Sequence, residues 1–150
     1  MACTAHVDQG IRHLIRADPV AVQTALGDLR ETGPMRALPQ EWQAMAELVL
    51  AEVLNNIVEH AYGSDGGQIE VTVRQSGPLL ACRVVDHGRP MPGETLPAGT
   101  LPDLDAADLP DGGFGWHLIR SLSQDLCYRR IGARNELTFC IGVNNQPSCP

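Results

Sequence analysis

The stretch that decides the fold is AEVLNNIVEHAYG, residues 51–63. Its apolar residues recur at intervals of three and four, which predicts an amphipathic helix with one buried face. Glu52, Asn56 and His60 follow one another every four residues along the edge of that face. They form one polar row, because four residues make about one helical turn. The row suits a hard cation and a water, since Mg²⁺ prefers oxygen ligands. Taken alone, it equally suits the polar boundary of an ordinary helix.

A second polar group occurs in VVDHGRPMPG, residues 84–93. An apolar strand is expected to end at Asp86, and Gly88 follows two residues later. An ionised aspartate only accepts hydrogen bonds, so a buried Asp86 needs a donor, and the exocyclic amine of adenine is one such donor. Gly88 would let a flat ring approach the backbone closely. The alternative is an aspartate that ends a strand in a turn.

The third group is PDGGFGWHLIR, residues 110–120, where Gly112, Gly113 and Gly115 lead into a predicted helix. Exposed backbone amides and the positive end of a helix favour a bound anion. A flexible hinge explains the same glycines. Each group has an ordinary explanation by itself, and it is their order and spacing along one chain that favour a functional site.

The remaining sequence places these groups in an α/β domain. Asp18 and Pro19 begin a first helix that Gly33 and Pro34 end, and the segment from 87 to 113 has no periodicity and is expected to be a lid. The other predicted elements are strands at 11–16, 68–75, 79–86, 125–131 and 135–143, and helices at about 39–62 and 114–124. They predict a two-layer sandwich, a mostly antiparallel mixed sheet with helices on one face. The opposite face is expected to be free for a partner.

Composition restricts the classes of function. The chain of 150 residues carries a net charge of −7, and all eleven basic residues are arginines. No basic patch is visible, so direct nucleic-acid binding is not expected, and no apolar run is long enough to span a membrane. Neither a signal peptide nor a metal-binding cysteine pair is apparent. We therefore expect one cytoplasmic domain over residues 1–150, with reduced cysteines and with Cys82 and Cys140 packed as small hydrophobes.

Glu-x-x-x-Asn-x-x-x-His-Ala-Tyr, then Asp-x-Gly-x-Pro, then Gly-Gly-x-Gly-x-x-Leu-Ile resembles the histidine-kinase-like (GHKL) ATPases. Within that superfamily the chain looks like the short anti-sigma-factor serine/threonine kinases. The resemblance runs from about Ile11 to Val143 and implies the Bergerat fold, with an ATP lid at about 87–114. It also implies two cofactors, ATP and Mg²⁺.

The resemblance assigns roles to individual residues. Asn56 would be the Mg²⁺ ligand, Glu52 the general base that activates a hydroxyl, and His60 a further lining residue. The other implied site residues are Asp86 for the adenine amine, Gly88 for the approach of the ring, Gly113 and Gly115 for the phosphates, and Thr138 for support of adenine through its hydroxyl.

Three hypotheses about activity follow. The first is a kinase that sequesters a sigma factor and phosphorylates a serine or threonine of an anti-anti-sigma antagonist, with a homodimer expected. The second is an ATP-binding partner-switching module without phosphotransfer, which the acidic lid and the absence of lysine favour. The third is a general ATPase or a fragment of a sensor kinase. The first predicts that Glu52→Gln loses phosphorylation and keeps nucleotide binding, and detection of a phosphorylated partner by intact-mass analysis rules out the second.

Overall fold

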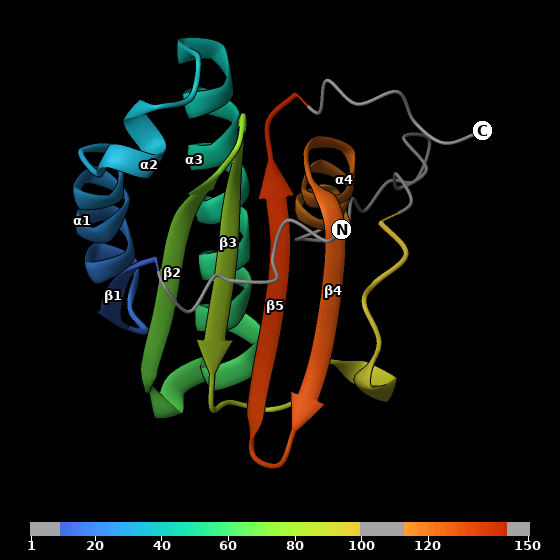
Figure 1. Ribbon diagram of the computed structural model, residues 1–150. Helices are drawn as coiled ribbons and strands as arrows, with labels where there is room; N and C mark the ends of the chain where they lie inside the picture. Colours follow the sequence, from blue (N-terminus) through green and yellow to red (C-terminus); the bar gives the residue numbers. More distant parts are fainter. Residues whose placement is uncertain (1–9, 100–112, 144–150) are drawn as a thin grey trace, which may run out of the picture.

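The computed structural model describes residues 10–99 and 113–143. Its centre is a five-stranded sheet in the order β1-β2-β3-β5-β4, with every pair of neighbours antiparallel. The strands are β1 (Ile11–Arg16), β2 (Gln68–Ser76), β3 (Leu79–Asp86), β4 (Gln124–Ile131) and β5 (Arg134–Ile141). The helices are α1 (Pro19–Arg30), α2 (Gly33–Arg36), α3 (Gln40–Asn56) and α4 (Gly113–Leu122). All of these helices lie on one face of the sheet (Figure 1), so the predicted two-layer α/β sandwich is confirmed.

Helix α1 begins as the sequence predicts, and its end differs from the prediction. The Asp18 side chain accepts a hydrogen bond from the backbone N–H of Ala21 at 2.8 Å, and Pro19 occupies the first turn. The helix ends at Arg30, and Gly33 and Pro34, which were predicted to end it, instead open the short helix α2. Proline suits this position because its φ is helical and the first turn needs no donor from it.

The helix that contains Glu52 and Asn56 changes from α-helical to π-helical geometry near its end. Helix α3 is followed directly by the π-helical turn η2 (Ile57–Tyr62), and Gly63 then adopts a positive φ of 58°. The buried Tyr62 hydroxyl donates to the carbonyl of Gln68 at 2.6 Å and accepts from the N–H of His87 at 2.7 Å. The tyrosine therefore ties the end of the helix to the start of β2 and to the end of β3.

The main core lies between the helices and one face of the sheet. Alternate residues of the strands point into it, as the period of two requires. The central contributors, all buried, are Val49, Leu50, Val53 and Leu54 from α3, Leu80, Cys82 and Val84 from β3, and Leu137, Phe139 and Ile141 from β5. Within the described residues, no helix is long and apolar enough to cross a membrane.

The other face of the sheet, which the sequence predicts to be free, is buried only in its middle. Thr72, Ala81 and Cys140 are buried there, whereas Leu14 of β1 and Cys127 of β4 are exposed. Cys140 is disulfide-bonded, which corrects the expectation of a reduced, simply packed thiol. Cys82, on the core side, is buried and free as predicted.

Glu136 lies among arginines on this second face. Its carboxylate accepts hydrogen bonds from Arg83 at 3.0 Å and Arg129 at 2.8 Å. Burial of Glu136 by itself raises its pKa, but the two arginines together outweigh that effect and hold the pKa below its ordinary value. The ionised carboxylate therefore contributes stability at neutral pH, which is lost as the pH falls through the lowered pKa.

Candidate functional site

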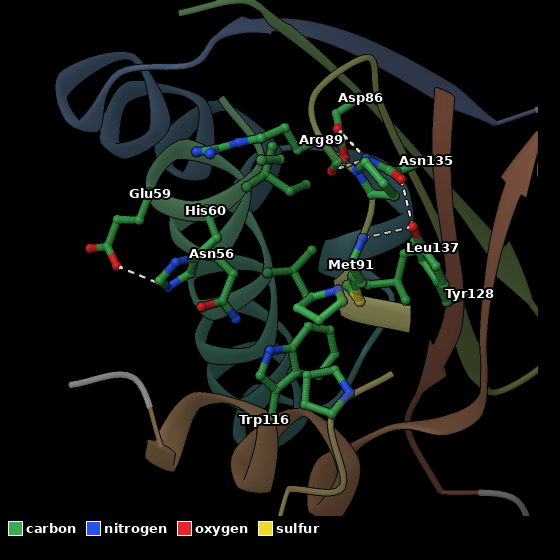
Figure 2. Close-up of a pocket in the computed structure, with 16 residues that line it drawn as sticks. Asn56, Glu59, His60, Asp86, Arg89, Met91, Trp116, Tyr128, Asn135 and Leu137 are labelled. Carbon is green, nitrogen blue, oxygen red and sulfur yellow. Dashed lines mark hydrogen bonds and ion pairs between the residues drawn. The ribbon is translucent and has the colours of Figure 1, made fainter. Parts of the chain in front are cut away.

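A cavity of about 540 Å³ opens between the helical layer and one end of the sheet (Figure 2). Side chains at the end of α3 and in η2 form one wall, the segment after β3 a second, and Trp116 of α4 a third. Its lining residues are Val53, Asn56, Ile57, Glu59, His60, Ala61, Asp86, Arg89, Pro90, Met91, Pro92, Pro97, Trp116, Tyr128, Asn135 and Leu137. The cavity thus brings together residues from all three groups that the sequence singles out.

The polar row on α3 and η2 extends from the cavity to the start of α4. Asn56 and His60 line the cavity, while Glu52 lies one turn earlier, against Gly115. A Cβ added to Gly115 would be 2.7 Å from Glu52 Oε2 and 3.7 Å from Asn56 Nδ2. The glycine therefore allows α4 to approach the two polar side chains that the sequence places in one row. His60 is at the rim, 67% exposed and 3.7 Å from the Glu59 carboxylate.

The Asn56 side chain has an unsatisfied polar atom. Its Nδ2 is buried and has no hydrogen-bond partner within the described residues. A buried amide without a partner costs free energy, so the position of this side chain suits a ligand with polar atoms. Rotation of the amide would present Oδ1 instead, because the two ends have nearly the same shape. Oδ1 is a suitable ligand for Mg²⁺.

The described residues contain no group of three or more His, Cys, Asp or Glu side chains able to hold a metal by themselves. Mg²⁺ commonly takes one or two protein ligands, several waters and oxygens of a bound phosphate. Asn56 together with a phosphate-bearing ligand fits that requirement, so the residues present are compatible with the predicted metal.

Asp86 is at the sheet side of the cavity and is only 4% exposed. Its Oδ1 accepts hydrogen bonds from the N–H of Gly88 at 2.9 Å and from Asn135 Nδ2 at 2.8 Å. Burial raises the pKa of Asp86 above its ordinary value, and these hydrogen bonds with the nearby charge of Arg130 only partly offset the effect. The hydrogen bonds from described residues use Oδ1, so Oδ2 is the acceptor available to a ligand.

Asn135 and Tyr128 are site residues that the sequence analysis missed. Both line the cavity, and the Tyr128 hydroxyl donates to Asn135 Oδ1 at 2.6 Å. Asn135 lies opposite Asp86 in the pairing of β3 with β5. The sequence contained one signal for Asn135, which is a polar residue near the start of the strand β5. Its meaning depends on strand pairing across almost fifty residues, which local patterns do not determine.

Gly88 packs against the end of the helical row. A Cβ at this position would lie 2.5 Å from the carbonyl oxygen and 2.6 Å from the carbonyl carbon of Ala61. The N–H of Arg89 donates to that same carbonyl at 2.8 Å. The absence of a side chain therefore lets the segment after β3 join η2, which closes one end of the cavity.

We expect Gly88→Ala to lower the free energy of unfolding by about 1–3 kcal/mol, because the methyl group collides with backbone that cannot move alone. Urea denaturation measures the change. Gly27→Ala is the matched control: no atom lies within 4 Å of its added Cβ, and it is inside α1, where alanine is favoured by up to about 1 kcal/mol. A Gly88→Ala protein as stable as the wild type would show that this contact is not tight.

The remaining predicted residues have different placements. Gly113 is the first residue of α4, as expected for a loop that ends in a helix. Thr138 is paired with Arg83 and Cys127, on the face of β5 opposite to the cavity-lining Leu137. Successive strand residues point to opposite faces, so the structure does not bring Thr138 to the site. This placement contradicts its predicted contact with adenine.

The predicted lid is described over residues 87–99, and residues 100–112 lie outside the described part. Its first half contains the short 3₁₀ helix η4 (Pro92–Glu94). Arg120 of α4 donates to the carbonyl of Pro97 at 2.8 Å, and the His117 ring lies 3.2 Å from the carbonyl of Gly99. Arg120 therefore holds the lid segment, while Arg89 is the arginine that lines the cavity.

Comparison with known proteins agrees with this geometry. The model of the histidine kinase-like ATPase domain family matches residues 15–141. A curated relative, the serine-protein kinase RsbW of Bacillus mycoides (strain KBAB4), is 31% identical over 83 residues, which are 53% of this chain and 52% of the relative. The chain thus matches about half the length of that protein.

Two solved structures share the fold. One contains the RsbU and RsbW domains of Rv1364c from Mycobacterium tuberculosis, with a TM-score of 0.58 and 16% identity over 88% of this chain and 32% of that one. The other is the blue-light activated histidine kinase EL346 of Erythrobacter litoralis, with a TM-score of 0.52 and 21% identity over 81% of this chain and 39% of that one.

Proposed function

The chain belongs to the histidine kinase-like ATPase domain family, and from this premise we propose that it is an ATP-binding anti-sigma factor with serine/threonine kinase activity. The observation that carries the proposal is the cavity with a buried carboxylate, Asp86, at one end and the Glu52–Asn56 pair beside the other. A nucleotide needs an acceptor for its base and a metal ligand for its phosphates, and this cavity provides both at opposite ends.

The base would bind at the sheet side. Asp86 would accept a hydrogen bond from the exocyclic amine of adenine. The apolar side chains of Met91, Trp116 and Leu137 would surround the ring. Burial excludes water from the carboxylate, which strengthens a hydrogen bond made there. Gly88 leaves space where the segment meets Ala61.

The phosphates would bind toward α4. Asn56 would hold Mg²⁺ together with the nucleotide, and the bound metal would neutralise charge on the phosphates. Gly113 and Gly115 at the start of α4 present backbone amides at the positive end of the helix. Arg89 adds a cation at the cavity wall.

Glu52 would act as the base in phosphoryl transfer. It takes the proton of a serine or threonine hydroxyl of the antagonist as the hydroxyl oxygen forms a bond to the γ-phosphorus. The bond from that phosphorus to the bridging oxygen of ATP breaks, and ADP leaves with both bonding electrons. Transfer of this kind depends on positioning and charge stabilisation, which the spacing of about one turn between Glu52 and Asn56 supports.

The relative named as the serine-protein kinase RsbW supports a protein substrate for the proposed kinase activity. We propose that the chain sequesters a sigma factor and phosphorylates its anti-anti-sigma antagonist. The N-terminal strand and the first helix each present an exposed apolar side chain for a partner or for a homodimer, since Leu14 is 54% and Val20 74% exposed.

A second candidate is a partner-switching module that binds ATP without transferring phosphate. The charge of the cavity favours it: Arg89 is its single arginine among the described lining residues, Glu59 is at the rim, and the chain has no lysine. In this case nucleotide controls the shape of the protein, and no phosphoprotein forms.

Calorimetric titration with Mg-ATP and Mg-ADP tests the shared part of both candidates, and we expect saturable binding at one site per chain. Candidate antagonist proteins are then incubated with the chain and Mg-ATP, and intact-mass analysis detects a gain of one phosphoryl group. A gain supports the kinase. Nucleotide-dependent complexes without such a gain support the module, and absence of nucleotide binding contradicts both.

A further inference from the structure

We propose that Asn135 is a positioning residue that orients Asp86 for a 6-aminopurine, and that Tyr128 holds Asn135 in that orientation. This inference rests on the proposed nucleotide site and adds two residues that decide its base selectivity. It also explains why the wall of the cavity after β3 keeps its shape without regular secondary structure.

Asn135 is placed to hold Asp86. It is 5% exposed and lies opposite Asp86 where β3 and β5 pair. Its Nδ2 donates to Asp86 Oδ1 at 2.8 Å and to the carbonyl of Arg89 at 2.9 Å. One amide group therefore connects the carboxylate that would recognise the base with the backbone of the cavity wall.

The orientation of the Asn135 amide is determined by its other end. Oδ1 lies 2.6 Å from the Tyr128 hydroxyl and 3.0 Å from Arg130 Nη1. An arginine can only donate, so the atom that faces it must be the carbonyl oxygen. The nitrogen must then face Asp86, and the amide cannot rotate without opposing a donor to a donor. The Asn56 Nδ2, by contrast, has no hydrogen-bond partner among the described residues.

The same residues hold the backbone of residues 88–91. The Tyr128 hydroxyl accepts from the N–H of Met91 at 3.1 Å, and Arg130 Nη1 donates to the carbonyl of Gly88 at 2.8 Å. Figure 2 shows Tyr128 between Met91 and Asn135, with the hydrogen bonds that join them. Base recognition and the cavity wall are thus parts of one network.

The network makes the site selective. Gly88 N–H and Asn135 Nδ2 both use Oδ1 of Asp86, so the second oxygen stays in one direction as a pure acceptor. A 6-amino group matches that acceptor. A purine without the amine leaves a buried charged acceptor without a partner, which is costly. Without Asn135, the carboxylate can turn and the preference for the amine is lost.

The test compares Mg-ATP with the Mg-complex of purine riboside triphosphate, which lacks only the 6-amine. Binding is followed by tryptophan fluorescence, because Trp116 lines the cavity. The quantity of interest is the dissociation constant of the purine riboside triphosphate divided by that of Mg-ATP. We expect Asn135→Leu to lower this ratio about tenfold or more relative to wild type, and Tyr128→Phe to lower it by about threefold to tenfold. Cys127→Ser, an exposed neighbour on the opposite face of β4, is the control and should keep the wild-type ratio.

The ratio separates an effect on positioning from an effect on folding, because loss of folded protein weakens the apparent binding of both nucleotides equally. A wild-type ratio in Asn135→Leu and in Tyr128→Phe overturns the inference even if both bind weakly. If Asn135→Leu does not fold, Tyr128→Phe decides by itself, since its ring still fills the same space. A wild-type protein that binds neither nucleotide overturns the proposed function instead. A wild type that binds both equally overturns the assigned base selectivity.

Discussion

Replacing Asp86 by asparagine is expected to weaken binding of Mg-ATP and Mg-ADP by about 100-fold or more without reducing the stability of the fold. The variant keeps Oδ1, which accepts from the N–H of Gly88 and from Asn135. The other carboxylate oxygen becomes an NH₂ group, a donor that would oppose the donor amine of adenine. Loss of a hydrogen bond to a charged group costs about 1.5–3 kcal/mol, and 2.8 kcal/mol corresponds to about 100-fold in affinity.

The stability of this variant follows from the direction of the pKa shift. Burial raises the pKa of Asp86 in the folded protein, so the folded state favours the neutral acid more than the unfolded state does. The associated stability is complete below the unfolded pKa and is lost as the pH rises through the folded pKa. At pH 7 the ionised carboxylate is therefore a net cost, which a neutral asparagine of the same shape avoids. We expect a midpoint of thermal unfolding equal to or above that of the wild type.

Calorimetric titration and thermal unfolding at pH 7 measure the two effects. Asp28→Asn makes the same chemical change at an exposed position of α1 and should bind nucleotide as the wild type does. Unchanged nucleotide affinity in Asp86→Asn would remove Asp86 from the recognition of the base. Loss of binding together with a large loss of stability would instead show that the carboxylate is mainly structural.

Replacing Glu52 by glutamine is expected to slow phosphorylation of the antagonist by about 10²–10⁴-fold, the usual contribution of a general base. Affinity for Mg-ATP should change by less than about threefold. Glu52 lies against Gly115 and beside Asn56 and is not among the residues that line the cavity. Glutamine has the same shape as glutamate but cannot take the proton of the attacking hydroxyl.

Single-turnover transfer, followed by intact mass, measures this effect, and calorimetry measures the affinity. Glu47→Gln is the matched control on α3, because Glu47 is paired with Arg30 of α1, away from the cavity. An exposed pair of this kind contributes at most about 1 kcal/mol. Full-rate phosphorylation by Glu52→Gln would show that another group accepts the proton.

Features that depend on neighbours in the sequence were predictable. The helix with Glu52 and Asn56 one turn apart is formed, because helical periodicity is a local property, whereas His60 lies beyond the end of α3, in the π-helical turn η2. The strand that ends at Asp86 and the helix that begins among the glycines of residues 113–115 are also formed as predicted, because both depend on patterns within short stretches of the sequence. The three motifs predicted the ATPase family, which the family match over residues 15–141 confirms.

Features that depend on distant neighbours were not predictable in the same way. Thr138 was placed at the site from resemblance, yet the register of β5 directs Leu137 to the cavity and Thr138 to the other face. A shift of one residue moves every side chain of a strand to the other face of the sheet. A strand assigned by pattern alone therefore does not determine which side chains face the cavity. The buried state of Ala81 and Cys140 also depends on contacts that no local pattern describes.

The sequence by itself determined the order of the elements, the one-turn spacing of Glu52 and Asn56 on α3 and the family of the chain, since these depend on spacings within a few turns or a few strand residues. Only the tertiary structure decided which polar side chains meet. Antiparallel pairing of β3 with β5 brings Asn135 to Asp86, and the close approach of α4 allowed by Gly115 brings Glu52 beside the start of that helix. Both contacts join residues about fifty or more positions apart, and packing of the helices on the sheet is what places them together.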